Sequence, residues 1–298
     1  MTVYGLEYRP KSYRPTGPLR RLQPLVRSEF RAMFHGRWTI MLYAACFLPA
    51  FVRMVVVLGW IGLLPFDGSA RERLDDAPEG FRMWIPIARE FYVELVVHAP
   101  NGVFFFVLVL TALATARAIA KDRATNALEL YWTRGISPFG YFVGKWFGAC
   151  LLLATLTVVA PTVVWMTGAM LADDWTFWES TSGFVPRVLL AQVMFTVVLS
   201  LLCVLVSAVA GSANVATILW CLMLGGSLAL SLFLSQMVHQ DLRATVSIWD
   251  AAGTLARAIA GMKTKAGDVE GAAWTLSGLT VVLMLLARRR LRISEALG

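Results

Sequence analysis

The sequence comprises 298 residues, of which 58% are hydrophobic and 15% charged, and it carries a formal net charge of +8. A soluble domain contains about 45–50% apolar and about 25% charged residues, so this composition excludes an ordinary soluble protein and indicates an integral membrane protein. The positive charge fits a membrane face rich in anionic lipid, and we expect no nucleic-acid partner.

The N-terminal residues 1–37 are predicted to lie outside the membrane. Residues 1–19 are polar and include three prolines, which indicates an arm without regular structure. Between 20 and 36, apolar residues recur at helical spacing among arginines, which predicts an amphipathic interfacial helix. The alternative is that this helix extends the first span. The apolar run that begins near Trp38 is too long for the core of a signal peptide, so we expect no cleaved leader.

Six stretches are apolar and long enough to cross a membrane, which takes about 20 helical residues. They are predicted at 38–64, 101–120, 144–171, 188–210, 215–237 and 271–287. Residues 211–214 alone separate the fourth from the fifth, as in a helical hairpin. The last stretch is short and must stand nearly upright. The predicted fold class is therefore all-α integral membrane, with one six-span domain over 38–287 and a basic tail over 288–298.

Lysine and arginine gather before the first span, between the second and third spans, and in the tail. Positive residues mark cytoplasmic connections, so we expect both termini to be cytoplasmic, in a multi-pass protein of the bacterial inner membrane. The connections 65–100 and 238–270 are then outside. Aromatic residues within 81–96 predict a helix resting at the outer interface, and 250–261 predicts an apolar helix that is outside or half-inserted.

The connection between the second and third spans contains a charged segment, 121–138, with the pattern of a short helix. The apolar residues that would share one face are Ala124, Ala127, Leu128, Tyr131 and Trp132. Gly135 can close a helix, and Ser137-Pro138 provides an N-cap and a first-turn proline for the next one. We therefore expect a helix over about 122–135, a stop and a new helix. The alternative is a plain amphipathic helix lying among lipid headgroups.

This segment resembles the cytoplasmic signature of type-2 ATP-binding-cassette (ABC) transporter permeases. The matching residues are Lys121-Asp122-Arg123, Leu128-Glu129-Leu130, Ile136-Ser137 and Gly144-Lys145. The chain departs from the family pattern at Asn126-Ala127, where Gly-Thr is usual, and at Gly135, where Pro is usual. Arg27-Ser28-Glu29-Phe30-Arg31 also resembles the family's helix before the first span. The strong match covers only 121–145.

The resemblance implies that 122–135 is a coupling helix, which docks on a separate cytoplasmic ABC ATPase subunit and transmits ATP-driven closure to the spans. The residues it assigns to ATPase contact are Arg123, Asn126, Leu128, Glu129, Trp132 and Arg134. Two faces compete for this contact, Glu129 with the arginines and Tyr131 with Trp132. The resemblance also implies a homodimer around a cavity lined mainly by the second and fifth spans, with ATP and Mg²⁺ bound only by the partner.

The sequence lacks the motifs of a catalytic, metal or cofactor site. The stretch Gly140–Lys145 has one residue too few for a P-loop, and Trp146 follows it in place of Ser or Thr. The three histidines lie in separate regions, and the four cysteines lie in apolar stretches without metal-binding spacing. We therefore expect no catalytic residue, no metal, no disulfide and no cofactor bound by this chain, so it is not an enzyme.

Arg53 is a charged residue deep in the first predicted span. An arginine at the centre of a span costs about 2.5–3.5 kcal/mol on insertion scales. One hypothesis is that Arg53 faces the translocation path or a subunit seam and meets an anionic substrate or lipid. The alternative is that Pro49 breaks the helix and Arg53 reaches an interface or pairs with an acid such as Glu94.

Three functions fit these features. The first is the permease subunit of an ABC exporter, driven by ATP hydrolysis on a separate subunit. The second is a non-transporting permease-like subunit that passes ATP-driven motion to periplasmic or membrane accessory subunits. The third is a membrane enzyme acting on lipid, which the lack of convergent polar residues in the spans disfavours. The sequence does not specify a cargo.

Overall fold

The structure, a computed structural model, describes residues 36–64, 79–98, 103–128, 136–172, 175–237 and 243–296, together with positions 23, 25–27, 30, 31, 34 and 131. Within these residues the chain is helical and contains no strand, which confirms the predicted all-α class. The arm 1–19 lies outside the described residues. Of the predicted interfacial helix over 20–36, positions 23, 25–27, 30 and 31 are helical.

Six helical stretches are long and apolar enough to cross a membrane, as predicted. They are Arg37–Trp60, Phe104–Ala124, Pro138–Leu171, Val185–Val209, Ala213–Met237 and Ala266–Arg290. The helix of the third begins at Pro138, before the apolar span expected from 144, as the Ser137-Pro138 pair predicted: the Ser137 hydroxyl accepts a hydrogen bond from the Gly140 amide (3.1 Å), with Pro138 in the first turn. The sixth belongs to a longer helix, α17 (Ala266–Ala296), since the polar residues beyond 271–287 remain helical.

The spans are assembled from shorter helices. They are α2 (Arg37–Ala45) and α3 (Leu48–Trp60); α6 (Val103–Leu110), η3 (Thr111–Thr115) and α7 (Ala118–Ala124); α9 (Pro138–Ala154), η4 (Thr155–Val159) and α10 (Ala160–Leu171); α12 (Val185–Val209); and α13 (Ala213–Cys221), η5 (Leu222–Gly226) and α14 (Ser227–Met237). Segments η3, η4 and η5 are π-helical. Pro161 follows η4 and lacks an amide donor, and η5 contains Gly225-Gly226, so two of these widened turns have a local cause.

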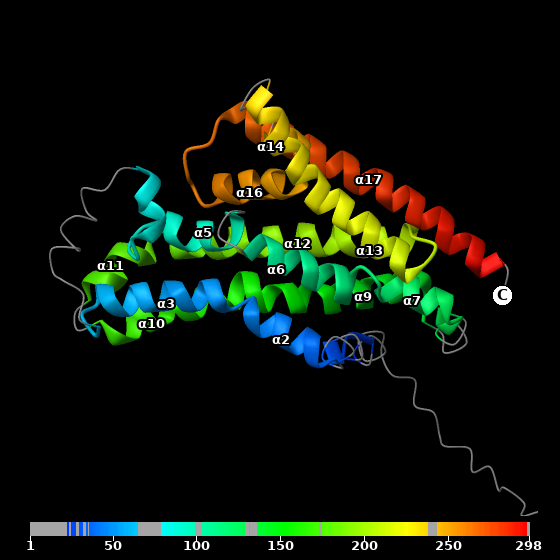
Figure 1. The fold of residues 1–298 in the computed structure, drawn as a ribbon, viewed down its shortest axis with the longest axis horizontal. Coiled ribbons are helices and arrows are strands. Elements are labelled where there is room, and N and C mark those ends of the chain that lie inside the picture. The colour runs from blue at the N-terminus through cyan, green and yellow to red at the C-terminus, as the bar shows by residue number, and fades with distance from the viewer. Residues whose placement is uncertain are drawn as a thin grey trace, which may run out of the picture.

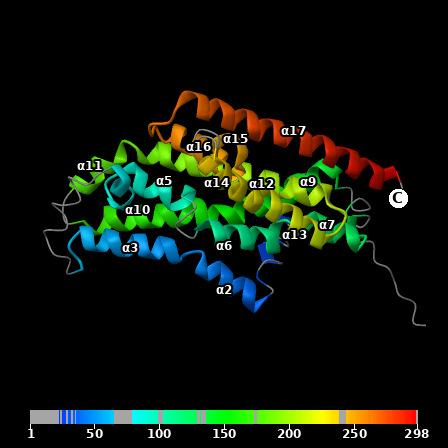
Figure 2. The ribbon, with the colours of Figure 1, turned by 45° about the horizontal axis from the view of Figure 1, so that its top comes forward.

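The helices form an elongated bundle with two distinct ends (Figure 1). We call one the α7 end, where α7 and the C-terminal part of α17 lie. The other is the α11 end, named for α11 (Thr176–Ser182). Figure 2 shows α17 and the α2–α3 pair on opposite sides of the bundle. Between them lies α12, which contacts α5, α7, α9, α16 and α17. Neighbouring helices cover α12 on several sides. A helix covered in this way can carry apolar residues on all its faces, and the sequence of α12 is mainly apolar throughout.

Two short helices are inserted among the spans near the α11 end. They are α5 (Arg89–Val97), where every residue from Phe91 to Val97 is buried, and α16 (Ile248–Ile259), whose Trp249 is fully buried. Both pack against α12 and against each other. The helix expected at the outer interface within 81–96 is therefore a core element, because its aromatic and aliphatic residues are covered by α12 and α16. The expected half-inserted helix within 250–261 corresponds to α16.

Candidate functional site

The segment 121–138 at the α7 end is divided rather than continuous. Helix α7 ends at Ala124, and Asn126 follows with a left-handed backbone (φ 53°) before Ala127 and Leu128 resume helical geometry. An asparagine tolerates this conformation, which explains why the chain can turn here. The expected helix over 122–135 therefore begins after this turn. Glu129, Trp132 and Arg134 lie outside the described residues.

Asp122 is held by two residues of the third span. The Lys145 ammonium nitrogen lies 2.6 Å from Asp122 Oδ2, and the Tyr141 hydroxyl donates to the same oxygen (2.8 Å). Lys145 and Tyr141 are almost completely buried. A buried ammonium needs such a counter-ion, since leaving it unpaired is costly. The acid before the turn is thus fixed to α9.

Arg123 and Ser207 join the second span to the fourth. Nη1 of Arg123 donates to the Ala210 carbonyl (2.9 Å) and Nη2 donates to the Ala208 carbonyl (2.7 Å), so the guanidinium caps the C-terminus of α12. In return, the Ser207 hydroxyl accepts from the amides of Ile119 (3.0 Å) and Ala120 (3.2 Å), which are first-turn amides of α7 without an intrahelical acceptor.

The other predicted contact residues that the structure describes, Asn126 and Leu128, lie in different environments. Asn126 is exposed beside the turn, whereas Leu128 is buried in the chain's own core with 3% of its surface exposed. The Tyr131 ring lies 5.2 Å from the Tyr141 ring. Among the described residues of the segment, Asn126 therefore offers a free surface, while Arg123 and Leu128 contact this chain itself.

A second polar network lies at the α11 end and joins α5 to α16. Arg257 binds both carboxylate oxygens of Glu94, at 2.6 and 2.9 Å, and His98 Nδ1 lies 3.5 Å from Glu94 Oε2. Burial acts to raise the pKa of Glu94, but the hydrogen bonds and positive charge of Arg257 and His98 outweigh it and lower this pKa to about 2. Trp249 adds a hydrogen bond to the Val97 carbonyl (2.7 Å), so α5 and α16 form one unit.

Arg53 lies in α3 with 2% of its surface exposed. Its guanidinium carbon is 4.4 Å from the centre of the Trp84 ring and 4.7 Å from that of Phe91, so the cation lies over two aromatic rings. Among the residues that the structure describes, neither Nη1 nor Nη2 of Arg53 has a hydrogen-bond partner. Glu94, the acid considered for Arg53, uses both oxygens on Arg257. Pro49 does lie in the first turn of α3, just after the break between α2 and α3.

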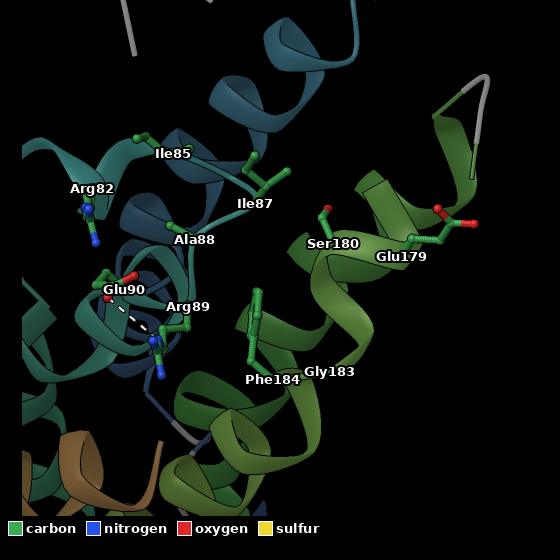
Figure 3. A pocket seen from close by; sticks show the side chains of 10 residues that line it. All are labelled: Arg82, Ile85, Ile87, Ala88, Arg89, Glu90, Glu179, Ser180, Gly183 and Phe184. Atoms are coloured by element: carbon green, nitrogen blue, oxygen red, sulfur yellow. Dashed lines mark ion pairs between the residues drawn. The ribbon is translucent and has the colours of Figure 1, made fainter. Parts of the chain in front are cut away.

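A cleft of about 540 Å³ opens at the α11 end. Figure 3 shows Arg82, Arg89 and Glu90 on one wall, from η1 (Glu79–Trp84) and α5, and Phe184 and Ser180 on the other. Arg89 donates to the Gly261 carbonyl (2.6 Å) and lies 3.7 Å from Glu90. The cleft therefore has charged groups of both signs. One of them, Arg89, already binds a backbone carbonyl and a carboxylate of this chain.

The ion pairs Asp122–Lys145 and Glu94–Arg257 were not predicted from the sequence, although a signal existed for each. Glu94 and Arg257 are charges within otherwise apolar stretches, and Lys145 stands at the start of a span. Within the described residues, no group of three or more His, Cys, Asp or Glu side chains could hold a metal ion. The polar groups that converge belong instead to structural networks that tie helices together.

No protein-family model and no curated protein matches the sequence. The fold itself defines the class: an all-α multi-pass membrane protein with six helices able to span the bilayer.

Proposed function

We propose that this chain is the membrane-spanning permease subunit of an ABC exporter. A separate cytoplasmic ATPase subunit would hydrolyse ATP and bind Mg²⁺, and the segment 121–138 would receive its motion. The observation that carries the proposal is the attachment of this segment: Asp122 is bound to α9 and Arg123 to the end of α12. An amphipathic helix that only lies among lipid headgroups would not require these bonds to the membrane spans.

The attachment supports a mechanism in which the segment pushes on the spans. A displacement at the turn around Asn126 acts on α7, which is fastened to the third and fourth spans within three residues of that turn. Charge-assisted bonds of this kind are short and directional, so they transmit movement with little slack. Motion in the segment therefore tilts α9 and α12 together instead of bending one loop.

The second copy required by this proposal would pack in the membrane plane. Large apolar side chains are exposed on the fifth span, among them Leu222, Phe233 and Met237. Such faces meet lipid or another apolar helix, and a homodimer would cover part of them. Both termini would be cytoplasmic, because the α7 end carries the basic segment and the arginines of α17.

The proposal is tested by purifying the tagged chain from its native membranes and identifying a P-loop ATPase that copurifies with it. We expect a stable complex whose ATP hydrolysis is higher than that of the ATPase alone. Glu129→Arg should abolish both the complex and the stimulation, whereas Thr125→Ala, a change at an exposed neighbour, should preserve them. An intact, stimulated complex with Glu129→Arg would show that the segment is not the docking site.

The alternative is a permease-like subunit that moves no cargo and instead acts on periplasmic or membrane partners. The observation that favours it is the amount of structure at the α11 end, namely α5, α16 and the 540 Å³ cleft. Directional, ATP-dependent movement of a labelled amphiphile in vesicles containing the complex would support the exporter over this alternative.

A further inference from the structure

Arg53 is a buried cation whose environment satisfies its charge but not its hydrogen-bonding groups. The rings of Trp84 and Phe91 face the guanidinium at 4.4 and 4.7 Å, and an aromatic face attracts a cation. An aromatic ring is at best a weak hydrogen-bond acceptor, so these contacts do not replace oxygen acceptors for the N–H groups. Within the described part of the chain neither terminal nitrogen has a hydrogen-bond partner, although only 2% of the side chain is exposed.

The nearest acid does not serve Arg53. Glu94 lies one turn beyond Phe91 on α5, close enough for its charge to be felt at Arg53. Both of its oxygens are nevertheless bound by Arg257, at 2.6 and 2.9 Å, and His98 lies 3.5 Å from one of them. The carboxylate is therefore already neutralised, and the donors of Arg53 remain for a group from outside the chain.

The position of Arg53 indicates what that group is attached to. Arg53 precedes the end of α3 at Trp60 by seven residues, or about 10 Å of helix. With the end of α3 placed at the membrane boundary, this depth is just inside the hydrocarbon region, below the headgroups. The stretch 82–85 borders both the α11-end cleft and Arg53, since Arg82 and Ile85 line the cleft while the Trp84 ring contacts the Arg53 guanidinium. Trp84 is only partly buried, so movement of its ring would uncover the guanidinium.

We propose that Arg53, held against the rings of Trp84 and Phe91, binds the phosphate of an anionic amphiphile that enters from the α11 end. The guanidinium of an arginine can donate two parallel hydrogen bonds to two oxygens of one phosphate. Lipid tails and uncharged glycerol headgroups offer no such pair of anionic oxygens. The site binds the amphiphile without any ATPase. Only the further role of that amphiphile as exporter cargo rests on the proposed function.

The test uses the purified full chain in a neutral maltoside detergent. Dioctanoyl phosphatidic acid, dioctanoylglycerol and inorganic phosphate are titrated separately, with binding followed by isothermal titration and stability by thermal unfolding. We expect phosphatidic acid to bind and to raise Tm, because a ligand that binds only the folded state stabilises it. Dioctanoylglycerol should do neither. If inorganic phosphate alone binds and competes, the same site is supported with a free phosphate as its source.

Arg53→Met is the informative variant, since methionine keeps apolar contact with both rings and removes the charge. Phosphatidic acid should bind this variant roughly 10- to 100-fold more weakly, the loss expected for charge-assisted hydrogen bonds. Its Tm without ligand should equal or exceed that of the wild type, because a buried unpaired cation is removed. Arg288→Gln, a change at an exposed arginine of α17 at the opposite end of the bundle, should bind like the wild type.

Two results would overturn the proposal. One is equal affinity of phosphatidic acid for the wild type and Arg53→Met. The other is a large fall in Tm with Arg53→Met together with no response of the wild type to phosphatidic acid, which would make Arg53 a purely structural clamp. Should Arg53→Met fail to fold, Arg53→Lys retains a cation without the fork, and unchanged affinity in that variant would count against the proposal. Because no ATPase is present, either failure leaves the permease proposal untouched.

Discussion

Lys145 illustrates how strongly a single buried charge can constrain a membrane protein. Asp122→Asn removes the 2.6 Å ion pair of its buried ammonium, and breaking a buried pair by removing one partner costs about 3–5 kcal/mol. We therefore expect a markedly lower Tm for Asp122→Asn in detergent. The double variant Asp122→Asn/Lys145→Met should recover most of the loss, because it removes the charge as well as its partner.

Thermal unfolding of the two single variants and the double variant forms a double-mutant cycle. If the double variant is as unstable as the sum of the single ones, the pair contributes nothing jointly, and Asp122 would not fix the segment 121–138 to α9 in the way its geometry indicates.

Glu94 predicts a pH dependence of stability. Its pKa is about 2 in the folded protein, against an ordinary value of 4.5. A lowered carboxyl pKa contributes stability that is complete above pH 4.5 and is lost as pH falls toward 2, worth about 3 kcal/mol. The Tm of the wild type should therefore fall between pH 5 and pH 3, as measured by thermal unfolding in maltoside.

Glu94→Gln should have a lower Tm at pH 7 and a smaller further decrease on acidification. Glu90→Gln provides the matched control, since this neighbouring carboxylate has only a 3.7 Å contact with Arg89. Parallel pH profiles for the wild type and Glu94→Gln would assign the acid sensitivity to other groups.

At the scale of elements, the contact between α5 and α16 depends on the absence of a side chain at Gly253. A methyl group there would overlap Cγ1 of Val97, which is itself buried. Overpacking of this kind costs about 1–3 kcal/mol, so Gly253→Ala should lower Tm even though alanine favours helix. Gly278→Ala on α17, where no atom lies within 4 Å of the new methyl, should leave Tm unchanged or slightly higher. A lowered Tm for the α17 variant and not for Gly253→Ala would show that the close approach is unimportant.

The elements differ in how well the sequence predicts them. Hydropathy and length identify the six spans, because a bilayer demands a long apolar helix. Ser137-Pro138 predicts the start of α9 through local capping chemistry. In contrast, α5 has only nine residues, and whether its aromatics rest on a membrane surface or inside the bundle depends on α12 and α16, which are distant in sequence.

In the candidate site, too, some features can be predicted from the sequence and others depend on contacts between distant residues. The charged segment 121–138 is evident from composition, but the turn at Asn126 and the role of Arg123 as a cap on α12 depend on three-dimensional neighbours. Leu128 has an apolar pattern that fits either a partner or the chain's own core, and the structure places it in the core. Periodicity defines a face of a helix without indicating what covers that face.

At the scale of the whole molecule, α12 connects the two polar networks. Near the α7 end it accepts hydrogen bonds from Arg123, and toward the α11 end Gln192 donates to the Tyr92 carbonyl of α5 (3.1 Å). An uninterrupted helix of 25 residues is about 37 Å long. One continuous helix therefore joins the residues that hold Arg123 to those that hold α5, and under the permease proposal it is the element that would carry movement from the segment 121–138 to α5.

This arrangement has consequences only if the two ends face opposite sides of the membrane, with the α7 end in the cytoplasm. Ser180→Cys on α11 and Arg289→Cys on α17 place exposed thiols at the two ends, in a background whose four cysteines are replaced by serine or alanine. A membrane-impermeant maleimide applied to spheroplasts should label Ser180→Cys at once, and Arg289→Cys only after the membrane is permeabilised. The charge distribution predicts this result, because connections rich in lysine and arginine are enriched on the cytoplasmic side. The reverse pattern would place the segment 121–138 outside, where no cytoplasmic ATPase could reach it, and the permease proposal would then be wrong even though the fold and both polar networks stood unchanged.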